Sequence, residues 1–147
     1  PGHARVSQLE PRGALWVAVD LDGREVQVFN THLGLVPREQ QNQAQALVGP
    51  AWLDHPDRQG PTILLGDFNV TSASAVYRTL SGVLRPARKQ AAKRSPSATF
   101  PSVMPVLRID HLFVSEQVRV LDVFAPYDRL TRVASDHLPL VMDFELI

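Results

Sequence analysis

The sequence of 147 residues contains no cysteine, carries no net charge and has no long apolar run. The absence of cysteine excludes disulfide bridges and thiolate metal sites. A formal net charge of +0 leaves no overall field that would attract nucleic acid or an anionic membrane, although a local site can still hold a polyanion. No stretch approaches the roughly 20 apolar residues of a membrane span. We therefore expect a soluble protein, with the cytoplasm as its simplest location.

The composition is otherwise that of a globular domain. Hydrophobic residues make up 44% and charged residues 20% of a chain that is long enough to enclose a core. The chain opens with PGHARVSQLEPRG, which has neither an initiator methionine nor the apolar core of a signal peptide. We expect residues 1–147 to form a single domain and to be a processed or truncated piece of something longer.

Hydrophobic periodicity predicts a mixed order of strands and helices. Alternating apolar residues on both sides of Asp22-Gly23, a favoured two-residue turn, predict a hairpin over residues 15–30. Apolar residues at helical spacing predict helices over residues 38–49 and 71–84. Short apolar runs predict four more strands, over residues 62–66, 108–115, 118–126 and 138–147. The fold class is therefore α/β, of the α+β kind, with mostly antiparallel pairing among the late strands.

The segment from Arg85 to Arg108 shows no periodicity, and we interpret it as a long surface loop. Its part RPARKQAAKRSPSATFPSVMP contains five basic residues among Pro, Ser and Ala: Arg85, Arg88, Lys89, Lys93 and Arg94. These side chains could hold a nucleic-acid backbone. A solvated, mobile loop is the favoured interpretation, because no aromatic residues are interleaved to support single-strand binding.

Polar pairs stand at four strand ends. The pairs are Asn30 with His32, Asp67 with Asn69, Asp110 with His111, and Asp136 with His137. Taken singly, three of them are typical of turns with local side-chain hydrogen bonds. Asp110 differs because it interrupts an apolar run, where a carboxylate without a partner is costly to bury. Four such pairs in one chain favour a functional site.

The residue types point to hydrolysis of a phosphate ester. Asp67, Asn69 and Asp136 are the oxygen donors that Mg²⁺ prefers. Histidine can act as a base near neutrality, and a carboxylate bonded to its other ring nitrogen fixes the tautomer and stabilises the cation. Such a site neutralises the phosphodiester, activates a water and stabilises the leaving alkoxide.

Four segments resemble the successive motifs of the endonuclease/exonuclease/phosphatase family, the group similar to DNase I. They are NTHLGL, ILLGDFN, RIDHLFVS and ASDHLPLVM, in the family's order, and TFPSVMP resembles a stretch found in bacterial members. The resemblance implies a DNase I-like four-layer α/β sandwich, in which helices flank two packed sheets. It also implies cleavage of phosphate esters that depends on Mg²⁺ or Mn²⁺.

The resemblance assigns substrate and water contacts to the first two motifs. His32 would contact and polarise the scissile phosphate, and Asn30 would support it. Asp67 would orient or deprotonate the attacking water. Asn69 would hold a phosphate oxygen or a metal-bound water. In this interpretation Gly66 lets the chain turn as its strand ends.

The last two motifs carry the remaining roles that the resemblance implies. Asp136 would be a metal ligand. His137 would hydrogen-bond the phosphate or act as base, and Asp110 would pair with His137 and hold its orientation. His111 matches a variable position, and we expect it to be structural.

The resemblance covers only the C-terminal part of the family's domain. The glutamate that is the family's principal metal ligand has no match, because Glu10, Glu25, Glu39 and Glu116 all stand in the wrong context. The strand over residues 138–147 would also lack its family partner, which would expose an apolar sheet face. We therefore expect weak or no activity from this chain alone, and a homodimer or strand swap.

Three functions remain open at this stage. The first is a metal-dependent phosphoesterase, nuclease-like, whose substrate could be DNA, RNA, a phospholipid headgroup or a small phosphoester. The second is a non-catalytic fragment or binding module that associates through its exposed sheet face. The third and weakest is a monoesterase for inositol phosphates or phosphosugars, because the sequence shows no extra basic pocket for several phosphates.

Overall fold

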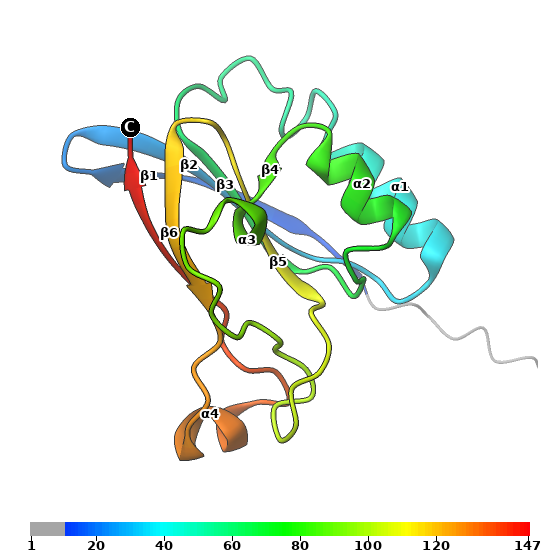
Figure 1. The fold of residues 1–147 in the computed structure, drawn as a ribbon. Helices are drawn as coiled ribbons and strands as arrows, with labels where there is room; N and C mark the ends of the chain where they lie inside the picture. The colour runs from blue at the N-terminus through cyan, green and yellow to red at the C-terminus, as the bar shows by residue number, and fades with distance from the viewer. Residues whose placement is uncertain (1–10) are drawn as a thin grey trace, which may run out of the picture.

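The structure, a computed structural model, describes residues 11–147 and contains two β-sheets (Figure 1). The larger sheet has five strands in the order β1-β2-β3-β5-β4. Their bounds are β1 Ala14–Leu21, β2 Arg24–His32, β3 Thr62–Asp67, β4 Arg85–Pro86 and β5 Asp110–Val114. The β2–β3 pair is parallel and the other pairs are antiparallel. The smaller sheet pairs β6 with β7 in antiparallel fashion, β6 Val118–Phe124 and β7 Val141–Leu146.

Helices α1 (Pro37–Leu47) and α2 (Ala75–Ser81) lie together against one face of the larger sheet (Figure 1). The short helix α3 (Ala87–Gln90) contacts β5 and β6. The short helix α4 (Arg129–Ala134) lies at one end of the molecule, apart from α1 and α2 (Figure 1). No helix in residues 11–147 is long and apolar enough to cross a membrane.

Two apolar cores lie on opposite faces of the larger sheet. One joins the sheet to α1 and α2 and is centred on the fully buried Phe29, Leu64, Phe68 and Phe113. The other fills the space between the two sheets with mostly β-branched residues, among them Val26, Ile63, Val114, Val118 and Val120. The described residues thus build a helix layer and two sheet layers of the expected sandwich.

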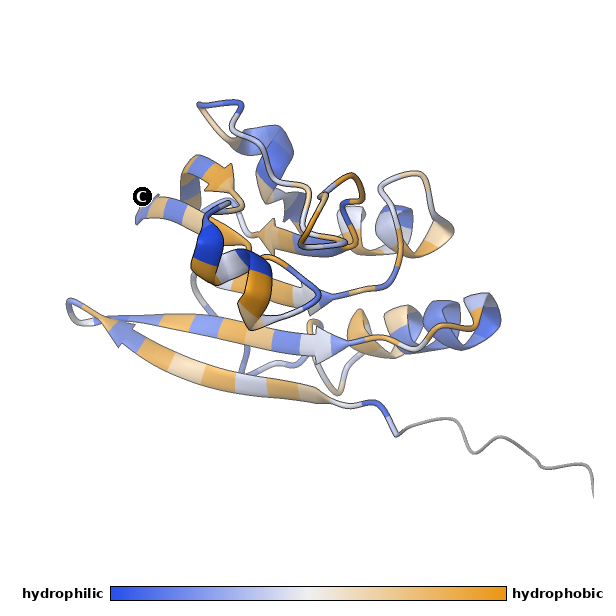
Figure 2. Cartoon of the chain, turned by 90° about the horizontal axis from the view of Figure 1, so that it is seen from below, coloured by the Kyte–Doolittle hydropathy of each residue, from blue (hydrophilic) through white to orange (hydrophobic). Residues whose placement is uncertain are grey.

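The space between the sheets opens into an apolar groove of about 400 Å³. Val19 and Leu21 of β1 line this groove and are 38% and 37% exposed. Hydrophobic residues recur along the long β1–β2 hairpin, which forms one margin of the molecule (Figure 2). Among the described strands, β7 pairs with β6 alone. An apolar sheet face is therefore open, as the sequence predicts, while a homodimer or strand swap stays a prediction.

The prediction of one long surface loop between Arg85 and Arg108 was wrong. This segment contains β4, α3 and an isolated bridge between Phe100 and Leu107. It also buries the side chains of Ala87, Ser97, Thr99 and Ser102. Elements of two and four residues are too short to give a periodic pattern, which explains why the sequence did not reveal them.

The assignment of Gly66 to a turn was also wrong, because Gly66 lies inside β3. Its φ is +150°, and a Cβ atom built on it would stand 1.9 Å from the carbonyl oxygen of Thr31 on β2. Glycine is needed here because two backbones approach closely. The sharp change of direction comes at Asn69, whose φ of 53° lies in the left-handed region that asparagine tolerates.

Candidate active site

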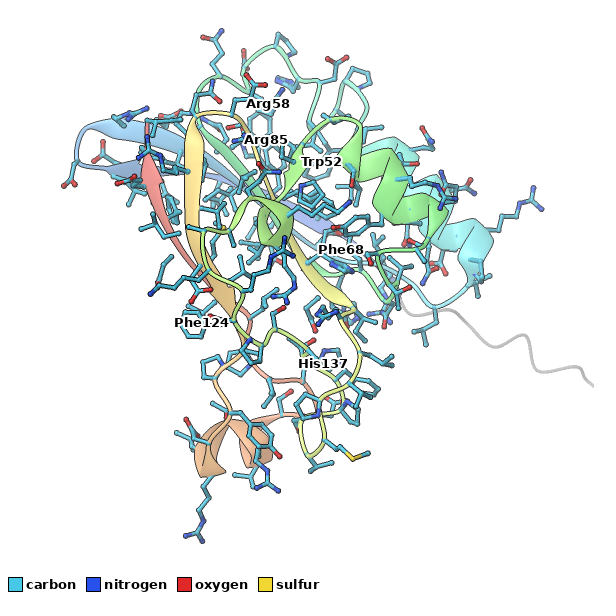
Figure 3. The ribbon with its side chains drawn as sticks, in the orientation of Figure 1. Trp52, Arg58, Phe68, Arg85, Phe124 and His137 are labelled. Atoms are coloured by element: carbon cyan, nitrogen blue, oxygen red, sulfur yellow. The ribbon has the colours of Figure 1, made fainter. Side chains whose placement is uncertain are left out.

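Strand pairing brings three of the predicted residues to one end of the larger sheet. In the β2–β3 register His32 stands opposite Asp67, and in the β3–β5 register Asp67 stands opposite Asp110. The end of β2, the end of β3 and the start of β5 therefore meet at the same edge. His137 joins them from the segment between α4 and β7. It lies at the end of the molecule that carries α4 (Figure 3).

His137 links two carboxylates. Its Nδ1 atom donates to Oδ2 of Asp110 at 2.8 Å, and its Nε2 atom lies 3.7 Å from Oδ2 of Asp67. The side chains are mostly shielded, with 24% of His137 and 18% of each aspartate exposed. A hydrogen bond from Nδ1 to Asp110 fixes the tautomer and directs Nε2 toward Asp67.

Two residues of the TFPSVMP stretch contact the His137–Asp110 pair. The buried Thr99 hydroxyl donates to Oδ2 of Asp110 at 2.5 Å, so this oxygen accepts from two donors. The Phe100 ring lies against the imidazole, with 4.9 Å between the ring centroids. The sequence singled out this stretch without giving either residue a role.

His32 stands on the other side of Asp67. Its Nε2 atom lies 3.3 Å from Oδ2 of Asp67, and its side chain is 53% exposed. Arg12 donates from Nη1 to Nδ1 of His32 at 2.9 Å, a contact that the sequence did not suggest. Oδ2 of Asp67 therefore faces two imidazoles, one shielded and one open to solvent.

The surrounding charges set the protonation of His137. Burial lowers its pKa, but the hydrogen bond to Asp110 and the charges of Asp110, Asp67 and Asp136 raise it more, so the net pKa lies above the ordinary 6.5. The carboxylates therefore favour the imidazolium form, which donates from both ring nitrogens.

Asn69 holds the loop that follows β3. Its backbone N–H donates to Oδ1 of Asp67 at 2.9 Å, and its side-chain Nδ2 donates to the carbonyl of Leu33 at 3.0 Å. These bonds tie the end of β3 to the end of β2. Asn30 is exposed and lies two residues before His32 on the same strand.

Asp136 precedes His137 on an exposed turn, where its Oδ1 accepts from the Ser135 hydroxyl at 3.3 Å. Its charge reaches the imidazole of His137. The carboxylate is not part of the close group that Asp67 forms with Asp110 and His137.

His111 points away from this group and into the α2 side of the sheet. Its Nε2 atom donates to the Val70 carbonyl at 2.7 Å, and its ring packs on Tyr77 with 5.0 Å between the centroids. Burial is the main cause that lowers its pKa below 6.5. These contacts are those of the structural residue that the sequence leads us to expect.

The donor set at the sheet end suits a divalent cation. One ligand atom each of Asp67, Asp110 and His137 lies within 4.8 Å of the others. Carboxylate oxygens are the ligands that Mg²⁺ and Mn²⁺ favour. Oδ2 of Asp110 already accepts from Thr99 and His137, so Asp67 offers the carboxylate better placed to hold an ion.

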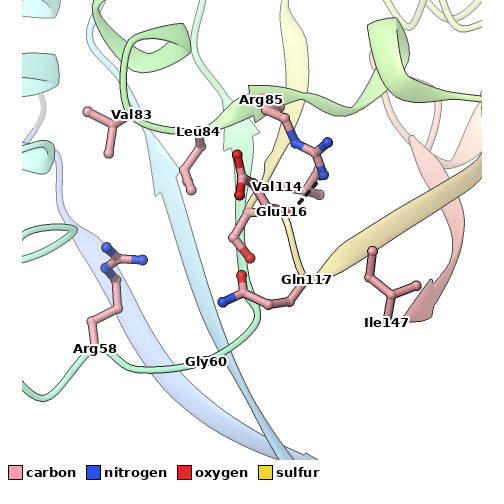
Figure 4. Close-up of a pocket in the computed structure, with 10 residues that line it drawn as sticks. Arg58, Gly60, Val83, Leu84, Arg85, Val114, Glu116, Gln117 and Ile147 are labelled. Carbon is pink, nitrogen blue, oxygen red and sulfur yellow. Dashed lines mark hydrogen bonds between the residues drawn. The ribbon is translucent and has the colours of Figure 1, made fainter.

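A separate cleft of about 610 Å³ lies at the other end of the sheet and shares no lining residue with this group (Figure 4). Arg58 and Arg85 line it, and both lie far from His137 in Figure 3. Arg85 donates to the carbonyls of Ser115 and Val118 at 3.1 and 3.3 Å. Its guanidinium therefore holds the β5–β6 connection.

The model of the endonuclease/exonuclease/phosphatase family matches residues 2–137. The chain belongs to this family. The match includes all four polar pairs at the strand ends and confirms the resemblance seen in the sequence. Members of this family are generally dependent on divalent metal ions, in keeping with the Asp67, Asp110 and His137 group.

The chain is also similar to a bacterial protein. The uncharacterized protein YbhP of Escherichia coli K12 is 30% identical over 96% of this chain and 55% of its own length. The chain thus spans about half the length of this relative.

The fold matches solved structures of the same family. A Bacteroides vulgatus family member aligns with a TM-score of 0.74 at 24% identity, over 95% of this chain and 66% of that one. The mannosyl-6-phosphatase Bt3783 of Bacteroides thetaiotaomicron aligns with a TM-score of 0.74 at 21% identity, over 95% and 67%. These alignments confirm the predicted α/β class and DNase I-like fold.

Proposed function

We propose that this chain carries the acid–base side of a phosphoesterase site that hydrolyses phosphodiesters with the help of Mg²⁺ or Mn²⁺. The observation that supports it most is the contact series from Asp67 through His137 to Asp110, with separations of 3.7 and 2.8 Å. Family membership supports the same chemistry. The described residues lack the metal-binding glutamate that the family resemblance implies, so the proposed metal site is incomplete without a further ligand.

In this proposal the two histidines recognise the scissile phosphate. Protonated His137 donates from Nε2 to a phosphate oxygen, while Asp110 balances its charge through Nδ1. His32, open to solvent on the other side of Asp67, donates to a second phosphate oxygen. Both contacts strengthen as negative charge builds on the phosphoryl oxygens in the transition state.

Asp67 is the proposed base, since its Oδ2 atom lies between the two imidazoles that bind the phosphate. From this place it orients the attacking water and takes its proton. Asn69 keeps the Asp67 carboxylate in this orientation through its backbone N–H, and Asn30 supports His32. The substrate could come from DNA, RNA, a phospholipid headgroup or a small phosphoester.

A divalent cation would be held by Asp67; Asp136 would have to turn from its bond with Ser135 to join it, with Asn69 or water completing the oxygen ligands. When bound, such an ion acts as a Lewis acid that neutralises phosphate charge and stabilises the leaving oxygen. The described residues contribute only part of its ligands. We therefore expect weak activity from residues 1–147 alone.

The test is hydrolysis of bis-p-nitrophenyl phosphate by the natural full-length protein with Mg²⁺ or Mn²⁺, and after chelation. Asp67→Asn keeps the shape of its side chain, His137→Gln keeps a polar side chain that can donate a hydrogen bond, and both remove the acid–base function. Both variants should lower kcat by about 10³, within the range seen for catalytic groups. Chelation should abolish the rate.

Asp22→Asn is the matched control. It removes a carboxylate from the exposed tip of the β1–β2 hairpin, where asparagine suits the positive φ of 54°. Its rate should equal that of the wild type. A wild-type protein that is inert with every metal would refute the proposal and favour a non-catalytic role, and a full rate in Asp67→Asn would refute Asp67 as the base.

A further inference from the structure

The structure reveals a basic pocket of about 300 Å³ beside the candidate active site. Four cationic side chains line it, Arg88, Lys89, Arg94 and Arg108. None of the described residues that line it is acidic. A basic pocket suited to several phosphates could not be seen in the sequence, because Arg108 lies fourteen residues after Arg94 and only the fold brings them together.

The cations of this pocket repel one another. Burial lowers the pKa of Arg88, and the positive charges of Arg108 and Arg94 lower it further, with only partial opposition from Asp122. Arg88 is held in place by a bond from Nη1 to the Ser95 carbonyl at 2.7 Å. A group of like charges of this kind is relieved by an anion.

The pocket adjoins the catalytic group through shared walls. Arg88, Arg108 and His111 line both the basic pocket and a small cavity whose wall includes Asp110. The charges of Asp67, Asp110 and Arg108 all act on the His111 imidazole. The small cavity that His111 lines therefore connects the surroundings of Asp110 with the basic pocket.

Another part of the wall of the basic pocket belongs to the loop that follows Asp67 and Asn69. Thr71 and Ser72 line the pocket, and they follow Asn69 on the loop between β3 and α2. Both are exposed and carry hydroxyl donors. Guanidinium forks together with hydroxyls are the donor set that binds phosphate oxygens.

The other two basic residues of the same segment, Arg85 and Lys93, do not line the pocket. Arg85 lies at the opposite end of the sheet and binds backbone carbonyls. Lys93 is exposed and does not line the pocket. Lys89, at the rim, places its Nζ atom 5.7 Å from the centre of the Tyr77 ring. Only some of the basic residues of this segment therefore line the pocket, an arrangement that differs from a uniformly basic loop.

We propose that this pocket binds a second phosphate group of the substrate, one or a few bonds beyond the ester that is cleaved. The proposal rests on the proposed function, since it assigns the scissile phosphate to the neighbouring His32 and His137. It narrows the substrate to esters that carry at least two phosphates. Such a second phosphate belongs either to a small bisphosphorylated molecule or to the backbone of a nucleic-acid strand.

The test compares two chromogenic esters on the natural full-length protein. Both are thymidine with a p-nitrophenyl phosphate on one hydroxyl, and only one of them carries a free phosphate on the other hydroxyl. The wild type should show a lower KM for the bisphosphorylated ester. Arg94→Gln and Arg108→Gln should each raise that KM about tenfold, the effect of one lost charge-assisted hydrogen bond, and leave the other ester unchanged.

Lys93→Gln is the matched control, because it removes an exposed charge from the same segment without touching the pocket. It should leave both KM values unchanged. Equal effects of Arg108→Gln on the two esters, or an effect of Lys93→Gln as large as that of Arg94→Gln, would overturn the proposal.

A short single-stranded oligodeoxynucleotide distinguishes the two sources of the phosphate. If the arginine variants also raise its KM and reduce the salt dependence of binding, the pocket takes a strand backbone. If they affect only the thymidine bisphosphate, it takes a small molecule. Both outcomes support a second-phosphate pocket and identify its ligand.

Calorimetry separates this proposal from the phosphoesterase proposal. Thymidine with free phosphates on both hydroxyls should bind to the wild type and bind about tenfold more weakly to Arg108→Gln. If neither ester is hydrolysed but this difference in affinity is found, the phosphoesterase proposal is refuted and the second-phosphate pocket is supported. If the wild type binds the bisphosphate no more tightly than the variant, the pocket is refuted whatever the catalytic result.

Discussion

Nδ1 of His137 lies 2.8 Å from Oδ2 of Asp110, although the two residues belong to segments on either side of β6 and α4. The bond fixes which nitrogen of His137 faces the site. It also places a negative charge behind the imidazole, where it supports a proton on the ring. The proposed chemistry depends on this pair more than on any other contact among the described residues.

Asp110→Asn should lower kcat on bis-p-nitrophenyl phosphate by about 10². Asp110 raises the pKa of His137, so its loss shifts that pKa downward. Because His137 is proposed to act as a cation, the basic limb of the kcat profile should move to lower pH. Rates measured across the pH range test this, and a basic limb that stays in place in Asp110→Asn would contradict a cationic His137.

Thr99→Val should lower kcat about tenfold with little change in KM, because the buried hydroxyl that donates to Asp110 at 2.5 Å is replaced by a methyl group of similar size. Thr99 touches no substrate and acts by positioning Asp110. Thr99→Ser keeps the donor and should restore most of the rate. Equal rates for the Val and Ser variants would show that the hydroxyl of residue 99 does not contribute to the rate.

The sequence singled out the candidate site residues more readily than their partners. Each of His32, Asp67, Asp110 and His137 follows or interrupts an apolar strand, which is a local pattern, and the structure brings the four side chains together. Their roles stay predictions. The Thr99 hydroxyl was missed because its partner lies eleven residues away, across an irregular segment. Contacts of this kind depend on the tertiary fold and leave no periodic signal.

In the fold too, elements with a periodic pattern were predicted, whereas a short element without one was missed. The β1–β2 hairpin, β3, α1 and the three late strands were predicted from periodicity and turn residues and are confirmed. Helix α4 was missed because it has six residues, none of them buried. Its one sequence signal is the capping box between Asp128 and Thr131, which alone does not predict a helix.

Gly66→Ala should destabilise the protein by about 3 kcal/mol, the upper end of the cost of forcing an atom into packed structure. The new Cβ would stand 1.9 Å from the Thr31 carbonyl oxygen, so β2 and β3 must separate at the strand end that carries His32 and Asp67. Activity should fall together with stability. Urea denaturation measures the change, and Gly13→Ala, which meets no atom within 4 Å, is the control. A loss no larger than that of Gly13→Ala would contradict the close approach.

The buried His111 should make the protein less stable as the pH falls below neutrality. Burial lowers its pKa in the folded state, so its stabilising contribution is present above the ordinary value of 6.5 and is lost as the pH falls toward the folded-state pKa. Urea denaturation at about pH 7.5 and pH 5.5, either side of the ordinary histidine pKa, should show this loss in the wild type. The His111→Gln variant cannot take up a proton at this position, so its loss of stability between the two pH values should be smaller.

His137→Gln provides the control of opposite sign for that experiment. The raised pKa of His137 gives a contribution that is present below 6.5 and is lost as the pH rises through the folded-state pKa. Removing it should therefore steepen the fall in stability toward acid pH, whereas removing His111 makes the fall shallower. If the free energy of unfolding depends on pH in the same way in both variants, the pKa shifts of the two imidazoles do not contribute to stability as proposed.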